Sequence, residues 1–346
     1  MHEIYVACGV DALFLEKDFL RRYVTGFYST DGYVVYDGNA CTLIVDARYF
    51  EAAEKALSGS DVCVKEGTRR DAVALLKKNC VLGVPYPYIT RSACEQLEQE
   101  GFLLKDCMPA LREAMKVKTE QEIAYIRIAC DIAEEAFLAL LPRLKEGMTE
   151  REAAAVLEYE MRMRGADGVS FETIVAFGAG SSVPHHETGD TRLAFGDVVL
   201  IDFGCKKEGY CSDCTRTFLF GDDGKHEAFK QHYALVLKAH ELVKERTFSG
   251  MKGCEADEIA RGVFREQGLD RAFTHSLGHG IGLEIHEHPL LSPRSEEVLT
   301  DGMVFSDEPG LYFAGEYGIR IEDSVTLKDG KVCSFMKKTQ HDLLIL

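Results

Sequence analysis

Short apolar runs alternate with helix-like stretches along the first third of the chain. The strand-like runs cover residues 32–38, 41–50, 61–67 and 79–86. The helix-like stretches cover residues 50–57, 70–78 and 90–100. Strands that alternate with helices are typical of a layered α/β domain, so we expect that architecture for residues 1–113.

A change of pattern near residues 108–118 marks the start of a long amphipathic helix. Thr119 and Glu122 form a capping box at its N-terminus. Apolar residues then recur three and four positions apart as far as Leu140, and Pro142 stops the helix. The sequence therefore predicts that a second domain begins here.

This second domain, expected over residues 114–346, repeats one order of elements. A helix capped by Thr149 and Glu152 completes a first helix pair, and strand-like runs follow it. A second helix pair, over residues 226–246 and 255–267, is again followed by strand-like runs. The repeated order predicts an α+β fold in which two half-units close around one site.

Two aspartates occur in the neighbouring strand-like runs of the first half-unit. If the turn is centred between Lys207 and Glu208, Asp202 and Asp213 lie directly opposite each other, with Cβ atoms roughly 5 Å apart. Like charges so placed destabilise a sheet, unless cations lie between them. Gly209 could instead impose a bulge that turns the two side chains to opposite faces.

A second acidic pair occurs in the last strand-like runs, 302–313 and 317–327. Glu308 and Glu322 can meet there across the strands. With 57 acidic residues in 346, many such pairs arise by chance on surfaces. Glu322, however, follows Ile321 in an apolar strand, and a charge embedded in an apolar strand needs a partner.

Three histidines cluster in a glycine-rich segment, residues 274–289. They are His275, His279 and His286. A spacing of four could place His275 and His279 on one face of a helix, but the three glycines between residues 278 and 282 argue against a helix. We expect a turn in which the backbone approaches a ligand closely.

Together, four carboxylates and one imidazole make a hard, strongly anionic ligand set. The set consists of Asp202, Asp213, His279, Glu308 and Glu322. Oxygen-rich sites of this kind suit manganese, cobalt, magnesium or zinc. The sequence therefore predicts a hydrolase with two metal ions.

The same segments resemble the metallopeptidase family that contains aminopeptidase P, prolidase and methionine aminopeptidase. The matching segments are residues 171–186, 196–218, 275–289, 307–312 and 318–323. The resemblance implies the pita-bread fold for residues 114–346. Residues 21–36 and 46–57 also resemble the creatinase-like N-terminal domain of aminopeptidase P, although Leu20 stands where that family usually has Asn.

The resemblance implies a role for each metal ligand. Asp202 would bind one of two divalent ions, and Asp213 and Glu322 would bridge both. His279 and Glu308 would complete the cage, and Glu308 would also be the general base that deprotonates a metal-bridging water. Mn²⁺ is the expected metal, with Co²⁺ or Zn²⁺ as alternatives.

The resemblance also assigns residues that touch the substrate. His185 and His286 would stabilise the tetrahedral intermediate and hydrogen-bond the substrate. His275, Arg320 and Tyr312 would shape the pocket for the residue after the scissile bond. Arg320 could equally be structural, since it lies two residues from Glu322 on one strand face and could hold a ligand.

The N-terminal domain favours cleavage before proline, because methionine aminopeptidases typically consist of the catalytic half alone. We therefore expect an Xaa-Pro aminopeptidase that acts on peptides with proline at the second position. An Xaa-Pro dipeptidase (prolidase) is the alternative, and a non-catalytic pita-bread interaction module is a remote one. We also expect a homodimer.

Composition narrows the setting. A net charge of −17 excludes the basic footprint that nucleic acid needs, and no apolar run approaches the 18 residues of a membrane span. Residues 1–18 lack the pattern of a secretory signal, so we expect a cytoplasmic protein. The twelve scattered cysteines are expected to be free thiols, and Cys211, which shares its parity with Asp213, could affect the site.

One loop departs from the family pattern. After Pro184 and His185 the family commonly has a small residue and then a proline, whereas this chain has His186, Glu187, Thr188 and Gly189. This departure predicts a more acidic and more mobile loop.

Overall fold

The computed structural model describes all 346 residues, which form two compact units, Met1–Met115 and Lys116–Leu346. The division falls inside helix α6 (Met108–Lys116), on which the expected boundary between residues 113 and 114 also lies. No helix in either unit has both the length and the apolar character that a membrane crossing requires.

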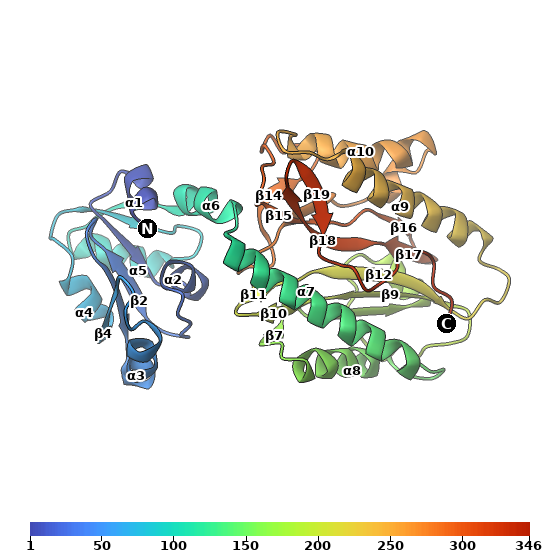
Figure 1. Cartoon of the computed structure of the whole chain (residues 1–346), viewed down its shortest axis with the longest axis horizontal. Coiled ribbons are helices and arrows are strands. Elements are labelled where there is room, and N and C mark those ends of the chain that lie inside the picture. The colour runs from blue at the N-terminus through green and yellow to red at the C-terminus, as the bar shows by residue number, and fades with distance from the viewer. The chain divides into compact units, whose positions relative to one another are not determined.

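The first unit is a layered α/β domain, as the sequence predicts. Its six-stranded mixed sheet has the order β4-β3-β2-β1-β5-β6. The strands are β1 (Ala12–Leu15), β2 (Tyr33–Tyr36), β3 (Cys41–Val45), β4 (Val62–Glu66), β5 (Val81–Val84) and β6 (Leu103–Asp106). The helices, drawn in Figure 1, are α1 (His2–Cys8), α2 (Asp18–Thr25), α3 (Ala47–Ala56), α4 (Arg69–Ala74) and α5 (Arg91–Gln99).

Two expectations for this unit need correction. The strand expected over residues 41–50 ends at Val45, because Asp46 begins a helix: its carboxylate accepts a hydrogen bond from the backbone N–H of Arg48. Strands β1 and β6 are absent from the prediction. For β1 the reason lies in its composition. Its four residues are all apolar and buried, so they lack the alternation by which a half-buried strand is recognised.

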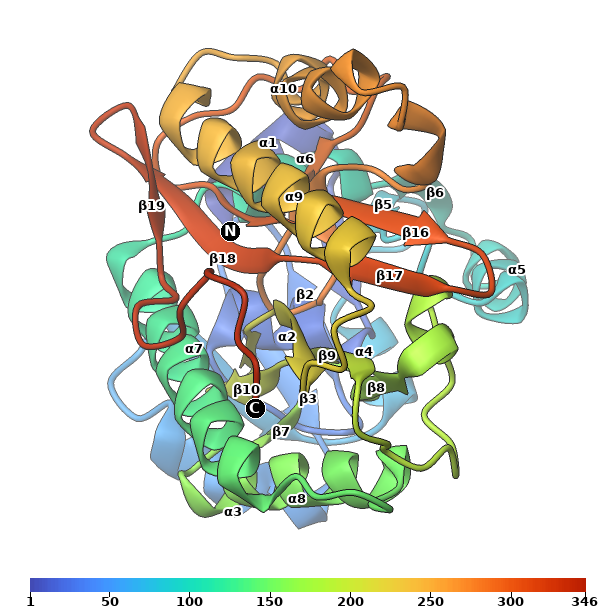
Figure 2. The ribbon, with the colours of Figure 1, turned by 90° about the vertical axis from the view of Figure 1, so that its right-hand side faces the viewer.

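The second unit contains both predicted helix pairs. They are α7 (Glu120–Leu140) with α8 (Glu150–Met163), and α9 (Glu227–Arg246) with α10 (Gly253–Glu266). Both predicted capping boxes form, one between Thr119 and Glu122 and one between Thr149 and Glu152. Such caps each contribute roughly 1 kcal/mol. Figures 1 and 2 show the two pairs on opposite sides of the unit, with strands between them.

The strands of the second unit form one large antiparallel sheet and two small ones. The large sheet has the order β14-β13-β15-β18-β12-β9-β8, and β19 pairs with β18. Its strands are β8 (Ile174–Phe177), β9 (Asp197–Phe203), β12 (Cys214–Phe220), β13 (Gly278–Gly280), β14 (Glu287–Leu291), β15 (Val304–Asp307), β18 (Glu322–Lys328) and β19 (Lys331–Ser334). The small sheets consist of β7 (Gly168–Val169), β10 (Cys205–Lys207) and β11 (Tyr210–Cys211), and of β16 (Gly310–Phe313) and β17 (Tyr317–Arg320).

The pairing of β12 with β18 joins the strands of the two half-units. Helices α9 and α10 cover the second half-unit with an apolar face in which Val243 and Phe264 are fully buried. These side chains belong to one core cluster with Phe305 of β15 and Val325 of β18. Burial of such side chains stabilises the fold by roughly 1.5–3 kcal/mol each, so the strands that lead to the second acidic pair are firmly packed.

The first acidic hairpin has a different register from the one expected. Asp202 pairs with Thr215, not with Asp213, because the turn consists of Glu208 and Gly209, one step later than assumed. Both turn residues have positive φ, 48° and 75°, as a two-residue type I′ turn requires. The prediction of direct opposition is therefore wrong. However, the observed partner of Asp202 lies two residues from the expected one. Because side chains two residues apart on a strand share a face, Asp202 and Asp213 still lie on the same face.

The second acidic pair has the predicted arrangement. Asp307 at the end of β15 pairs with Asp323 in β18. The same register resumes at Gly310 and Arg320, so it places Glu308 opposite Glu322. The run 302–313 divides into β15 and β16 beside Glu308, and the run 317–327 divides into β17 and β18 beside Glu322. The two glutamates therefore lie between the β15–β18 pairing and the β16–β17 pairing. The glutamates thus stand at strand ends, where their side chains can reach a cavity.

Candidate active site

A cavity of about 540 Å³ in the second unit collects the predicted site residues. Nine of the ten line it: His185, Asp202, Asp213, His275, His279, His286, Glu308, Arg320 and Glu322. The tenth, Tyr312, is buried behind this lining and contacts two of its members. The glycine-rich segment forms strand β13 with bends on both sides, so His275 and His279 do not share a helix.

Three of the carboxylates converge most closely. Asp202, Asp213 and Glu322 each offer an oxygen atom within 4.8 Å of the others. Asp202 comes from β9, Asp213 directly precedes β12 and Glu322 begins β18, so the cluster draws on both half-units. Gly204 permits the close approach of the first two segments, since a Cβ there would lie 1.9 Å from the carbonyl oxygen of Ser212.

Burial and mutual repulsion shift the pKa values of these carboxyls. Burial and the charges of Glu322 and Asp202 hold the pKa of Asp213 well above its usual range. Burial and the charge of Glu308 do the same for the pKa of Glu322, and burial together with Asp202 raises the pKa of Glu308 to about 8. The carboxyls cannot all be ionised near neutral pH unless positive charge joins them.

The donor geometry fits metal ions. Oδ1 of Asp202 is buried and has no hydrogen-bond partner. Nδ1 of His279 lies 3.1 Å from the carbonyl oxygen of Gly280, which can only accept, so Nδ1 carries the proton. The unprotonated Nε2 then faces Asp213 at 3.6 Å and Glu308 at 3.4 Å, an arrangement that a cation between them would stabilise.

Two hydroxyl groups orient candidate ligands, and the sequence prediction missed both. Thr215 donates a hydrogen bond to Oε2 of Glu322 at 2.6 Å, and Ser306 donates one to Oε1 of Glu308 at 3.0 Å. Each lies two residues from a predicted ligand on the same strand, Thr215 from Asp213 and Ser306 from Glu308. The period of two could have identified them, since such residues share a face.

Arg320 holds one of the candidate ligands, as its structural interpretation predicts. Its Nη2 lies 2.6 Å from Oδ2 of Asp202, and its Nε donates to Thr215 at 3.0 Å. The carboxylate that it holds is that of Asp202. Arg320 is 3% exposed and Asp202 is partly buried, so this pair lies on the wall of the cavity.

A directional chain of hydrogen bonds continues from Arg320. Its Nη1 donates to Oη of Tyr312 at 2.6 Å. Nδ1 of His275 donates to the carbonyl oxygen of Ser276, so Nε2, 2.9 Å from Oη of Tyr312, accepts the tyrosine proton. Burial and the charge of Arg320 lower the pKa of His275 to about 3, which keeps this imidazole neutral.

The two remaining predicted histidines face the cavity from different segments. His286 packs edge-on against His279, with ring centroids 4.3 Å apart, and burial lowers its pKa. His185 lies on the loop between β8 and β9. That loop is anchored on both sides of His185: the carboxylate of Glu150 accepts hydrogen bonds from the backbone of Phe177 and of Gly189. These contacts argue against the mobility expected for it.

Cys211 does not line the cavity. Its thiol is fully buried and lies 3.8 Å from the carbonyl oxygen of Leu283. Burial raises its pKa to about 12, so the metal-binding thiolate is disfavoured.

A partly buried cage of carboxylates and one imidazole, at the junction of two helix-helix-strand halves, is typical of a metal-dependent hydrolase. The chain belongs to Metallopeptidase family M24, whose model matches residues 124–329. Residues 2–114 match the Creatinase/Prolidase N-terminal domain. The predicted family, its pita-bread fold and its creatinase-like first domain are thereby confirmed.

Relatives of known name cover nearly the whole chain. It is 35% identical over 340 residues to the Xaa-Pro dipeptidase of Pyrococcus furiosus, spanning 97% of this chain and 96% of that one. The structure of an Xaa-Pro dipeptidase from Bacillus anthracis matches with a TM-score of 0.92 and 34% identity, over 99% of this chain and 98% of the other. An X-Pro aminopeptidase from Thermotoga maritima matches with a TM-score of 0.89 and 33% identity, over 99% of both chains.

These names bear on the expected activity. The chain is a hydrolase of the metallopeptidase class, as predicted. The aminopeptidase subtype is less well supported than the dipeptidase alternative, because two of the most similar relatives are both named Xaa-Pro dipeptidase. The comparisons thus favour the alternative that the sequence leaves open.

Proposed function

We propose that this chain is a metal-dependent peptidase that hydrolyses the bond between a residue and a following proline, with Xaa-Pro dipeptides as its main substrates. The observation that carries the proposal is the set of five ligand side chains gathered in one cavity with His185 and His286. The names of the relatives support the dipeptide preference. The intact ligand set speaks against a purely non-catalytic scaffold.

In this proposal the five ligands are Asp202, Asp213, His279, Glu308 and Glu322. When bound there, two divalent ions would supply the Lewis acidity that activates water and polarises the peptide carbonyl. Mn²⁺ is the proposed metal, with Co²⁺ or Zn²⁺ as alternatives, and all suit a ligand set of four carboxylates and one imidazole.

Glu308 is the residue to which we assign proton transfer. Its carboxylate takes a proton from the attacking water and returns it to the departing proline nitrogen. The hydrogen bond from Ser306 keeps Oε1 in one orientation, which favours a repeated transfer along the same path. His185 and His286 are assigned to the oxygen that becomes negative during the attack, since both line the cavity.

The proline ring is assigned to the part of the cavity near His275 and Arg320. His275 is neutral and has both ring nitrogens occupied, so it offers a fixed, uncharged surface. Tyr312 and Arg320 act through it by holding its orientation.

A second candidate is cleavage of longer peptides that begin Xaa-Pro. The cavity lining contains one arginine and no lysine, and that arginine, Arg320, already contacts Asp202, Tyr312 and Thr215. A dipeptide would bring the carboxylate of its proline into the same cavity without a free cation to meet it. A longer peptide has a neutral amide at that place.

The test compares kcat/KM for Ala-Pro, Ala-Pro-Ala and Met-Ala-Ala with Mn²⁺ present. We expect hydrolysis of Ala-Pro, no cleavage of Met-Ala-Ala, and a lower rate for the tripeptide that contains proline. A clear preference for Ala-Pro-Ala moves the assignment to aminopeptidase. Cleavage of Met-Ala-Ala alone contradicts proline specificity.

The role of Glu308 is tested separately. Glu308→Gln should lower kcat by at least a hundredfold, while Glu316→Gln, an exposed glutamate in the turn between β16 and β17, should not change it. Near-wild-type turnover in Glu308→Gln would remove Glu308 as the base. The predicted homodimer is tested by sedimentation of the same preparations.

A further inference from the structure

Strands β15 and β18 carry two acidic pairs in consecutive positions. Asp307 lies opposite Asp323, and the next position places Glu308 opposite Glu322. Consecutive residues of a strand point to opposite faces. In agreement with this rule, Glu308 and Glu322 line the active-site cavity, whereas Asp307 and Asp323 are 0% exposed and do not line it.

Asp307 and Asp323, here called the hidden pair, raise the same electrostatic difficulty as Glu308 and Glu322 on the cavity side. Like charges directly opposite each other destabilise a sheet, and buried charges need compensation. On the cavity side, the proposed metal ions would provide this compensation. On the other side, the positive charge must come from the chain itself.

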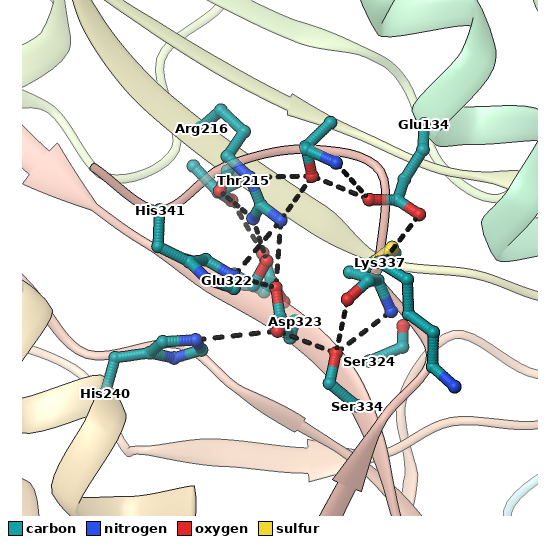
Figure 3. Close-up of polar contacts among 12 residues, drawn as sticks. Glu134, Thr215, Arg216, His240, Glu322, Asp323, Ser324, Ser334, Lys337 and His341 are labelled. Atoms are coloured by element: carbon teal, nitrogen blue, oxygen red, sulfur yellow. Dashed lines mark hydrogen bonds and ion pairs between the residues drawn. The ribbon is translucent and has the colours of Figure 1, made fainter. Parts of the chain in front are cut away.

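His240 of helix α9 lies at the hidden pair. Its Nδ1 is 3.1 Å from Oδ2 of Asp307, and its Nε2 is 3.5 Å from Oδ2 of Asp323. The imidazole is itself 0% exposed, and Figure 3 shows it pointing at Asp323. One side chain of α9 therefore spans both strands.

The two aspartates depend on His240 to different degrees. Asp323 has several other partners, which are Arg216 at 2.9 Å, His341 at 2.9 Å, Ser334 at 2.7 Å and Lys244 at 3.5 Å. Asp307 makes no hydrogen bond through either oxygen, and its one ion-pair contact within 4 Å is His240. Removal of His240 therefore leaves Asp307 uncompensated.

A metal ion is the competing occupant of this cluster. His240, Asp323 and His341 offer ligand atoms within 4.8 Å of one another. Arg216 and Lys244, however, already bring two positive charges to the oxygens of Asp323. A cation would be repelled there, so the side chains themselves neutralise the cluster.

We propose that His240 is a positioning residue for the metal cage: by bridging Asp307 and Asp323 it keeps Glu308 and Glu322 at the separation that binds metal. Nδ1 of His240 makes an ion-pair contact with Asp307 and has no other hydrogen-bond partner, while Nε2 lies 3.3 Å from Nζ of Lys244. The inference rests on the proposed function in one respect, that Glu308 and Glu322 are ligands.

The test compares the Mn²⁺ affinity of the full-length wild type and His240→Gln, measured by competition with a chelator. Glutamine is neutral and its amide cannot donate toward both aspartates in the geometry of an imidazole ring. We expect the dissociation constant to rise 10- to 100-fold, as is typical when support for a metal ligand is lost. At saturating Mn²⁺, kcat should recover substantially and KM should stay close to the wild-type value.

A same-helix control and a rescue separate positioning from general damage. His232→Gln changes a half-buried histidine of α9 that contacts Tyr317 and lies outside the site, so it should leave Mn²⁺ affinity unchanged. The double variant His240→Gln/Asp307→Asn removes both charged partners of the His240–Asp307 contact. Its Mn²⁺ affinity should return to within about threefold of wild type. It also serves as the test if His240→Gln alone does not fold.

The outcomes distinguish this inference from the proposed function. Wild-type protein that hydrolyses Xaa-Pro substrates while His240→Gln keeps full Mn²⁺ affinity overturns the inference alone, as does a double variant that binds as weakly as the single one. A third Mn²⁺ per chain that is lost in His240→Gln overturns it in favour of a metal site. Wild-type protein that binds no divalent ion overturns both.

Discussion

Glu150 and His186 join a helix to the active-site loop. Nε2 of His186 lies 3.0 Å from Oε2 of Glu150, which is 0% exposed in the first turn of α8. The same carboxylate accepts backbone hydrogen bonds at 2.9 Å from Phe177 and from Gly189. One buried side chain therefore fixes the start, the middle and the end of the loop that carries His185.

Replacement of Glu150 should therefore reduce both stability and turnover. In Glu150→Gln one of the three donors faces an amide N–H instead of an oxygen, so the free energy of unfolding should fall by about 2–3 kcal/mol. kcat should fall several-fold while Mn²⁺ affinity is kept, because the loop holds His185 and no ligand. Urea unfolding and steady-state kinetics measure both effects.

The control for this prediction is Glu146→Gln, four residues earlier on the exposed surface. Its unfolding free energy should stay within about 0.5 kcal/mol of wild type. Equal effects of the two substitutions would show that the buried carboxylate has no special role in the loop.

Tyr312→Phe tests the hydrogen-bond chain from Arg320 to His275. The change leaves Nε2 of His275 without a donor and Nη1 of Arg320 without its closest acceptor. The free energy of unfolding should therefore fall by about 1–3 kcal/mol. KM for Ala-Pro should rise several-fold, because His275 loses its fixed orientation, and Mn²⁺ content should not change. Tyr317→Phe, which loses one contact with His232, is the matched control. An unchanged KM would exclude Tyr312 from substrate binding.

The effect of Asp213→Asn on thermal stability should have opposite signs with and without metal. In the presence of a chelator, Asp213→Asn should melt at the same or a higher temperature than wild type, because it relieves repulsion from Glu322, Asp202 and Glu308. With excess Mn²⁺ the order should invert, because wild type gains more from ion binding. Differential scanning calorimetry under both conditions tests this crossover. Asp213→Asn that is less stable than wild type in both conditions would contradict the cage.

The sequence predicts the site residues better than their register. Glu308 and Glu322 have the predicted pairing, whereas Asp202 pairs with Thr215 because the hairpin turns at Glu208 and Gly209. Glycine signals such a turn, but positive φ at a glutamate does not show in the sequence. The sequence therefore does not fix the turn position to within one residue. A shift of one residue in the turn changes the cross-strand partner by two residues.

Supporting residues were harder to predict than ligands. His240 and Glu150 lie on helices far along the chain from the strands and loops that they hold. An isolated histidine or glutamate on an amphipathic helix has the pattern of an ordinary surface residue. Only the packing of the helix against the sheet brings it into a buried network, and that packing depends on long-range contacts.

The buried position of His240 predicts a pH-dependent contribution to stability. Burial opposes its protonation, but the charges of Asp307 and Asp323 outweigh burial and raise its pKa to about 9. The groups that face it are Asp307 of β15, Asp323 of β18, Arg216 of β12 near Asp323, Lys244 of α9 and His341 of the C-terminal segment. Because this pKa lies above the ordinary value of about 6.5 for histidine, the proton stabilises the folded state fully below pH ~6.5, and this stabilisation is lost as pH rises through about 9. The difference in unfolding free energy between wild type and His240→Gln, measured by urea in chelator from pH 6 to 9.5, should thus be largest at the acidic end and shrink toward the alkaline end. A difference that is constant, or that grows with pH, would mean that His240 is neutral in the folded protein.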